Sequence, residues 1–378
     1  MSTSNLFRLS LAFVAGLLVS APAFAQEAEQ EESAWYEGVV FEGGLTAILQ
    51  GTAGNDTAET KDQTDYAYSA DFAAIAEVAD GHTLAIVFEA GEGEGANDNL
   101  GSRAIPDYDG YLSQVEGAAK ADVNQIYYEG AFFDGAFTLL LGKMDFHALT
   151  DGNEYAGDET SQFLNGLFVR SAGVIFAEHE FYYAPTVAVI LQPVEVVSLT
   201  LAHSKHVGDD LFSNGYQAAE LGIHLAFGDL AGNYRFGYLR HDVEYHAISD
   251  GSVTANTGWF VSADQAVTSG VGLFVRYAKQ DDSLVENEVT AALSGGLSLD
   301  GDLWGRPGDG IGLAYGALTL NTDLVTEFNE GESVVEAYYR YAVSEGLTVT
   351  ADAQGFQNLE RAEARSVSVF SLRMQAGF

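Results

Sequence analysis

Three arginines occupy equivalent positions in three alternating segments of the chain. Arg276 lies in GVGLFVRYA, Arg340 in VVEAYYRYAV and Arg373 in the final SLRMQAGF. In each segment the residues on either side of the arginine, and every second residue from them, are mostly apolar. A strand there therefore has one apolar and one polar face. A guanidinium donates hydrogen bonds that can replace the water around a solute hydroxyl, and nearby carboxylates and amides can do the same. The chemistry that these residues suggest is reversible contact with a polar solute.

The same parity argument assigns a larger set of side chains to a polar interior and to solute contact. These candidates are Lys143, Asp145, Glu220, His224, Phe274, Arg276, Glu336, Tyr338, Arg340, Asp352, Gln354 and Arg373. If these segments are strands of a membrane barrel, as the alternation described below predicts, a slip of one residue would move each set to the lipid face. An arginine at the bilayer midplane costs about 2–4 kcal/mol. The strand that holds Lys143 and Asp145 is apolar on both faces, so parity decides less there. An alternative is that the interior charges pair with one another and only keep the lumen polar.

Other chemistries have less support in the sequence. The chain has no cysteine, and its eight histidines are scattered without an H-E-x-x-H motif. Asp107, Asp109 and the acidic stretch 151–159 offer oxygen ligands suited to Ca²⁺, but their spacing fits no EF-hand, and a solvated acidic loop is favoured. His224 and His241 could serve an outer-membrane hydrolase as bases, although no serine motif stands near them. We predict no enzyme, no cofactor and no resident metal, with Ca²⁺ binding by the loops left open.

The segments that carry these residues alternate between polar and apolar positions along the whole chain. Residues 66–80 and 82–90 flank Asp80-Gly81, a strong hairpin signal, and Asp134-Gly135 repeats it. About sixteen such segments follow one another, with a poorly patterned one counted within 165–178. Between them, very short turns contrast with longer polar connections at 91–121, 147–164, 204–214 and 281–287. The pattern predicts an all-β fold: a closed antiparallel transmembrane β-barrel with short periplasmic turns and long extracellular loops.

The two ends of the chain fit an exported barrel. Residues 1–25 are predicted to be a signal peptide ending on Ala23-Phe24-Ala25, residues 26–34 a flexible acidic leader, and 35–378 the barrel. The last residues, 367–378, alternate strictly and end on Phe378. An unpaired strand edge is prohibitive in a bilayer, so this strand should close the barrel against the first. The terminal phenylalanine also resembles the signal that bacterial barrel-assembly machinery recognises.

The net charge narrows the choice of partners. The formal charge is −39, and loss of residues 1–25, whose one charged residue is Arg8, makes it −40. Nucleic acid is excluded, because phosphate binding needs basic patches. Acidic loops at the mouth of a pore would instead concentrate cations at low salt.

Three stretches resemble the carbohydrate-selective porin OprB family: residues 139–165, LWGRPGDGIGLAYG (303–316) and VVEAYYRYAVSEGLTVTADAQGF (334–356). The resemblance covers roughly residues 120–378; the segment after Phe356 lacks an expected Pro-Gly turn. It implies a passive channel, often of sixteen strands, that admits small sugars such as glucose across the outer membrane. The alternatives are a general cation-preferring porin, a barrel hydrolase, or a plugged structural barrel. Expected partners are small carbohydrates, outer-membrane lipid and the assembly machinery, with the choice between monomer and homotrimer left open.

Overall fold

The computed structural model describes residues 38–57, 60–113, 121–171, 183–205, 214–324, 331–359 and 365–378. The predicted signal peptide and acidic leader lie outside these residues.

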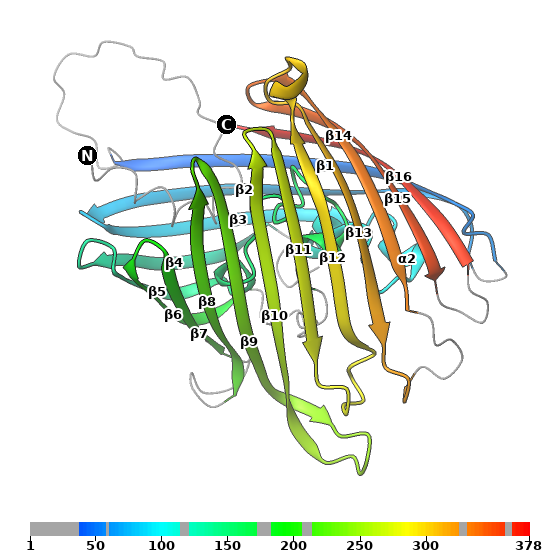
Figure 1. The fold of residues 1–378 in the computed structure, drawn as a ribbon, viewed down its shortest axis with the longest axis horizontal. Coiled ribbons are helices and arrows are strands. Elements are labelled where there is room, and N and C mark those ends of the chain that lie inside the picture. The colour runs from blue at the N-terminus through cyan, green and yellow to red at the C-terminus, as the bar shows by residue number, and fades with distance from the viewer. Residues whose placement is uncertain are drawn as a thin grey trace.

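Sixteen antiparallel strands form one closed barrel (Figure 1). Their bounds are β1 Val39–Ala53, β2 Thr64–Ala79, β3 His82–Gly93, β4 Asp122–Phe132, β5 Phe137–Asp145, β6 Tyr183–Val194, β7 Val197–Lys205, β8 Gly215–Phe227, β9 Leu230–His246, β10 Val253–Thr268, β11 Val271–Gln280, β12 Val289–Asp300, β13 Gly310–Leu320, β14 Ser333–Ser344, β15 Leu347–Leu359 and β16 Arg365–Gly377. Each strand pairs with its neighbours in sequence, and β1 pairs with β16. The predicted fold class is confirmed.

The connections alternate in length, as expected. Even-numbered strands lead into odd-numbered ones through short turns such as Asp80-Gly81 and Asp134-Gly135. Asp134 and Gly135 have φ values of 56° and 84°, the left-handed conformation that such turns require. The β12–β13 connection is the longest on this rim and contains the 3₁₀ helix η5 (Gly301–Trp304). The two longest connections, β3–β4 and β5–β6, leave from the opposite rim.

The last strand closes the barrel as predicted. Its register runs from Gly44 opposite Gly377 to Ala53 opposite Ser368. Beyond the strand, the backbone N–H of Phe378 donates to Gly43 O at 3.0 Å, and the Gly43 N–H donates to Phe378 O at 3.1 Å. A Cβ at residue 43 would overlap the Phe378 ring. The terminal residue therefore takes part in the seam between the chain ends.

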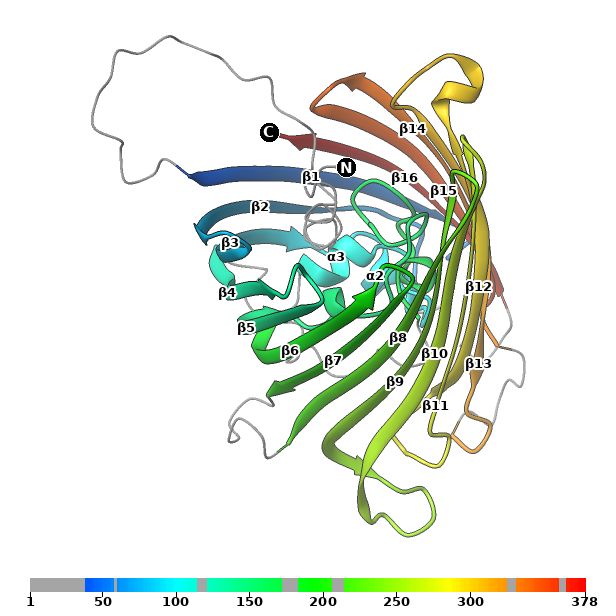
Figure 2. The ribbon, with the colours of Figure 1, turned by 60° about the vertical axis from the view of Figure 1, so that its left-hand side comes forward.

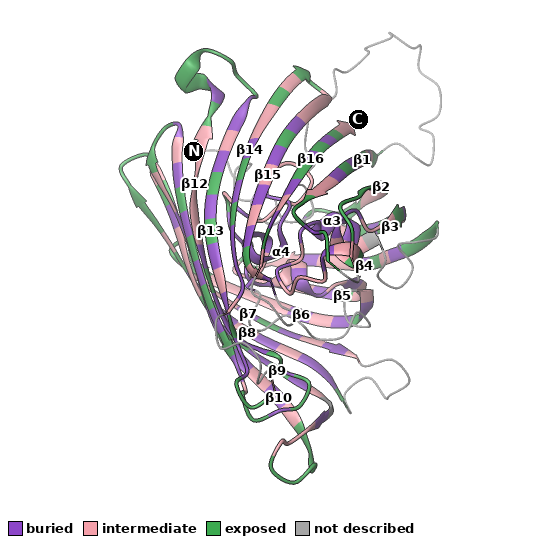
Figure 3. Cartoon of the chain, turned by 90° about the vertical axis from the view of Figure 1, so that its right-hand side faces the viewer, coloured by how far each residue is buried: buried purple, intermediate pink, exposed green. Residues whose placement is uncertain are grey.

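Burial alternates along the strands, and buried and exposed bands follow one another along β13, β14 and β15 in Figure 3. The exposed positions on the outside are apolar, among them Leu273, Val275, Val335, Phe370 and Leu372. Among the described residues, no helix is long and apolar enough to serve as a membrane span.

Two of the long connections fold into the barrel (Figure 2). The β3–β4 loop contains α2 (Asn97–Leu100) and α3 (Tyr108–Ser113), and the β5–β6 loop contains η3 (His147–Leu149) and α4 (Gly166–Val169). The strand expected within 165–178 is wrong for its described part, because Gly166–Val169 is helical and fully buried. Its apolar residues pack against the inner wall instead of facing lipid.

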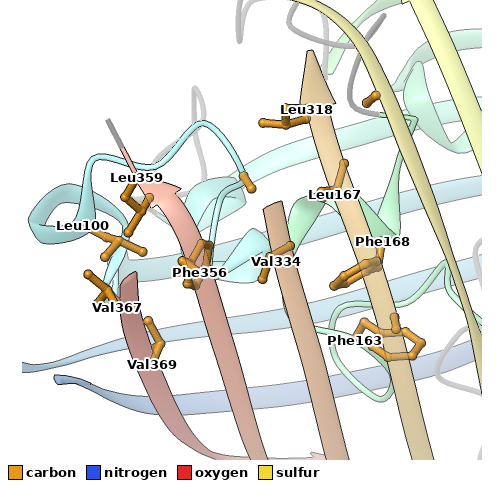
Figure 4. Close-up of a cluster of buried hydrophobic side chains, with 14 of the residues drawn as sticks. Leu100, Phe163, Leu167, Phe168, Leu318, Val334, Phe356, Leu359, Val367 and Val369 are labelled. Atoms are coloured by element: carbon orange, nitrogen blue, oxygen red, sulfur yellow. The ribbon is translucent and has the colours of Figure 1, made fainter. Parts of the chain in front are cut away.

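The main apolar core lies between these loops and the inner wall. Phe163, Leu167 and Phe168 of the β5–β6 loop pack with Leu100 of the β3–β4 loop and with wall residues that include Leu318, Val334, Phe356 and Val369 (Figure 4). Burying this apolar surface stabilises the inward position of both loops.

Candidate solute site inside the barrel

The β5–β6 loop is held across the interior by Glu336 of β14. The Glu336 carboxylate accepts hydrogen bonds from the backbone N–H groups of Leu164 at 2.6 Å and Asn165 at 3.0 Å. Asn165 then donates to Ala104 O at 3.2 Å and to Gln354 Oε1 of β15 at 3.0 Å. These bonds satisfy polar groups that would otherwise be buried without partners.

Arg276 of β11 binds the same loop at Asp151, Ala156 and Phe168. Its guanidinium donates from Nε to Asp151 Oδ1 at 3.2 Å, from Nη2 to Asp151 O at 3.1 Å, and from Nη1 to the carbonyls of Ala156 and Phe168. The Asp151 carboxylate also accepts from the backbone N–H and hydroxyl of Ser171. The Asp151 N–H donates to Glu220 Oε2 of β8 at 2.7 Å. Arg276 is 1% exposed, so it acts as a structural anchor here.

The other two arginines bind the middle of the loop. Arg373 of β16 donates to Glu159 O at 2.7 Å and Gln162 O at 2.9 Å. Arg340 of β14 donates to Ser161 O at 3.3 Å and is only half-buried. Arg340 is therefore the one of the three predicted arginines whose side chain also reaches lumen water.

The two aromatic candidates pack against the loop. The Phe274 and Tyr338 rings are each 5% exposed, and their centroids lie 5.5 Å and 5.0 Å from the centroid of Phe163. Their inward direction follows the predicted parity. In this arrangement they contact protein, so their part in solute contact stays a prediction.

Lys143 was assigned to the wrong face. It pairs with Ile126, which is 53% exposed on the outside, whereas its neighbour Met144 is 2% exposed and lies inside. The error arose because β5 is apolar on both faces, so alternation could not decide. Asp145 ends the strand, and its carboxylate accepts from the backbone N–H of His147 at 2.8 Å, where the loop begins.

The β3–β4 loop has its own anchors, which sequence reasoning missed. Gln50 of β1 accepts from the Ala96 N–H at 2.7 Å and donates to Pro106 O at 3.3 Å, and Gln354 donates to the same carbonyl at 2.7 Å. Ser69 of β2 donates to Asp109 Oδ1 at 2.8 Å. Gln50 and Ser69 lie on the polar parity of their strands, so extending the parity analysis to β1 and β2 could have found them.

Carboxyl groups gather where the two loops meet the wall. Burial raises the pKa of Asp107 to about 7 and the pKa values of Asp109 and Glu159 to about 8. Asp71 and Glu89 stand opposite each other on β2 and β3 and lie within electrostatic range of Asp109. Within the described part of the chain, no three His, Asp or Glu residues are arranged to hold a metal ion. The two loops and the facing wall thus share a cluster of carboxyl groups whose negative charge increases as the pH rises through about 7–8.

His224, also predicted to face inward, belongs to a polar row that crosses four strands. Its Nε2 lies 3.0 Å from Ser198 Oγ, and its Nδ1 lies 2.8 Å from Asn233 Oδ1. Asn233 donates to Asp264 Oδ1 at 2.6 Å, and Arg235 pairs with Asp264 Oδ2 at 2.8 Å. Of the predicted set, His224 and Arg340 are half-buried, whereas Asp352 and Gln354 are buried among the loop anchors.

A closed sixteen-strand barrel with apolar outer positions, short turns on one rim and loops folded inside defines an outer-membrane porin. Residues 55–378 match the family model described as carbohydrate-selective porin, OprB family. The chain therefore belongs to the carbohydrate-selective porin OprB family, whose members pass small carbohydrates, and it resides in the outer membrane.

Solved structures support the fold. The high-pH structure of Pseudomonas putida OprB is 16% identical, with a TM-score of 0.78, over 90% of this chain and 94% of that chain. Its low-pH structure is 15% identical, with a TM-score of 0.57, over 90% and 93%. The outer membrane channel DcaP of Acinetobacter baumannii is 11% identical, with a TM-score of 0.57, over 90% and 97%. No curated protein matches the chain significantly.

Proposed function

We propose that this porin gives passive diffusion to small neutral sugars, with glucose as the model solute, and that it works without a catalytic step. The observation that carries the proposal is the clamping of the β5–β6 loop across the interior by Glu220, Arg276, Glu336 and Arg373. A loop fixed in this way narrows the lumen permanently. A solute that passes must then exchange part of its water for protein groups.

The polar groups beside the loop suit such an exchange. A sugar hydroxyl both donates and accepts, and the half-buried Arg340 presents a guanidinium donor to it. The remaining predicted contacts act through the loop that they position. Binding at such groups has to be weak, since a solute that binds tightly leaves the channel slowly.

A general cation-preferring porin is the second candidate, and the carboxyl cluster of Asp71, Glu89 and Asp109 favours it, because ionisation of this cluster places negative charge beside the lumen. The two functions predict different responses of the channel to glucose. A sugar-selective pore saturates with glucose and shows current block, whereas a general pore discriminates by size and charge alone.

For assembly, we propose that Phe378 is read by the barrel-assembly machinery before it joins the seam with Gly43. The seam pairs the chain ends within one molecule, which is compatible with a monomer and with a homotrimer. Cross-linking of the purified protein in detergent distinguishes the two.

The test of the sugar function is liposome swelling with purified, heat-modifiable protein. Glucose should enter faster than in protein-free liposomes, and glucose should reduce the potassium current of single channels in a saturable way. Swelling without current block would favour the general porin. Swelling no faster than in protein-free liposomes, with a folded barrel, would contradict both.

A further inference from the structure

A second polar site lies toward the short-turn rim, on the periplasmic side of the clamped loop. His224 of β8 stands directly opposite Asn233 of β9, and Asn233 stands directly opposite Asp264 of β10. Residues in direct register share one face of a sheet, so these three side chains form a row on the inner wall. Ser198 of β7 extends the row through its contact with His224.

The direction of every hydrogen bond in this row follows from one ion pair. Arg235 donates to Asp264 Oδ2, and Asp264 Oδ1 accepts from the Asn233 amide N–H. The amide oxygen of Asn233 therefore faces His224 Nδ1, which must carry the proton. In the neutral imidazole, His224 Nε2 is then the acceptor, and the Ser198 hydroxyl donates to it. The row presents donors and acceptors in a fixed order.

The loop contributes the opposite side of this site. The Glu154 backbone N–H lies 3.4 Å from Asp264 Oδ2. The ring of Tyr155 covers Gly272 of β11, where a Cβ would overlap it. A Cβ at Gly222 would likewise overlap the Ser198 hydroxyl. Two positions without side chains thus make room for the ring and for the row.

Part of this set remains exposed to the lumen. Ser198, His224, Asn233 and Tyr155 are half-buried, whereas the Arg235 and Asp264 side chains are only 10% and 2% exposed; the anchors Arg276 and Glu336 are fully buried. Arg235 and Asp264 neutralise each other, so neither an anion nor a cation gains much from binding this pair. A neutral ring with several hydroxyls and a C–H face matches an ordered polar row beside an aromatic ring.

We propose that Asn233, Arg235 and Tyr155 form a second sugar-binding site on the periplasmic side of the β5–β6 loop, with Ser198 and His224 fixing the orientation of the Asn233 amide. Asn233 and Arg235 bond the hydroxyls of a neutral sugar, and the Tyr155 ring covers its C–H face. This inference rests on the proposed sugar function and adds to it a place where the solute pauses before leaving the channel.

The test uses glucose block of single-channel potassium current, with glucose added from the periplasmic side. Tyr155→Ala and Asn233→Ala should each raise the half-blocking concentration about 5–10-fold, the loss expected for one good contact. Tyr155→Phe keeps the ring and should stay close to wild type. Thr138→Ala, which changes an inward residue of β5 outside the site, is the matched control.

Tyr155 lies on a loop, so its variants leave the barrel wall intact and keep the test decisive if Asn233→Ala fails to fold. Unchanged block in Tyr155→Ala, with wild type blocked normally, would overturn the second site and leave the sugar function standing. Absence of both swelling and block in wild type would instead remove the proposed function itself. Covalent labelling of Ser198 by a fluorophosphonate would also overturn the site, since it would identify an activated nucleophile.

Discussion

The inner faces of β14 and β16 differ sharply from the short-turn ends of β7, β8 and β9, beyond the loop anchor Glu220 of β8. On the first, Glu336 and Arg373 are at most 1% exposed and bond to the backbone of the β5–β6 loop. On the second, Ser198, His224 and Asn233 bond to one another and stay half-buried. Polar side chains that face the lumen therefore have two roles in this barrel. Those on β14 and β16 hold the loop, and those in the row remain available to solute.

The largest effect should come from destroying the anchoring wall itself. Phe370 and Leu372 face outward on β16, 57% and 52% exposed. Replacing both with Asp places carboxylates in hydrocarbon on the closing strand, and we expect loss of assembly. Gln375→Asp, on the inward face of the same strand, is the control and should assemble. Heat-modifiable mobility of the outer-membrane fraction measures the outcome. Normal assembly of the double variant would contradict the closing-strand assignment.

The next effect separates anchoring from solute contact. Arg276→Ala leaves the buried Asp151 carboxylate without its cation, a change that typically costs about 3–5 kcal/mol. The β5–β6 loop should then leave the wall, so single-channel conductance should rise severalfold and sugars larger than glucose should enter liposomes.

Arg306→Ala is the control for this variant, because Arg306 lies in the exposed β12–β13 connection, where it pairs with Asp309. Its conductance should equal wild type. An Arg276→Ala channel that is folded, with wild-type conductance and size limit, would show that the loop is held without this clamp.

Sequence alternation predicted the strand order, the closure and the inward direction of Arg276, Arg340 and Arg373, because lipid outside and polarity inside leave one parity for a charge. It failed for Lys143, where both faces of β5 are apolar. It also could not tell that Arg276 and Glu336 serve the loop. Apart from the Asp151 carboxylate, their partners are backbone groups of residues 151–168, and backbone groups carry no sequence signature. The row from Ser198 to Asp264 was not predicted either. It forms only in one register of four strands, and alternation within each strand does not give the register between strands.

A smaller effect concerns pH at the two inward loops. Burial raises the pKa of Asp107 to about 7 and those of Asp109 and Glu159 to about 8, so the packed loops hold more protons than an unfolded chain would. The stability of this packing should therefore be greatest near pH 4 and fall as pH rises through about 8. Over the same range ionisation should increase cation preference. Reversal potentials at pH 6 and pH 8.5 measure this, and Asp109→Asn should flatten the change. A cation preference of the wild-type channel that falls as pH rises would contradict this assignment of the carboxyl groups.

The smallest expected effect tests Arg340, which stands between the two kinds of wall. It belongs to the anchoring strand β14, yet its bond to Ser161 O is long at 3.3 Å and its side chain is half-buried. Arg340→Ala should leave the loop in place, raise cation preference and weaken glucose block, because one change removes a positive charge and a donor. Arg340→Lys keeps the charge but loses the planar fork, so it should restore selectivity more fully than block.

The change in ion selectivity caused by Arg340→Ala should shrink as salt shortens the Debye length to about 10 Å at 0.1 M. Reversal potential under a KCl gradient and glucose titration decide the matter. If Arg340→Ala changes neither, Arg340 does not border the permeation path, and the polar face of β14 serves anchoring alone.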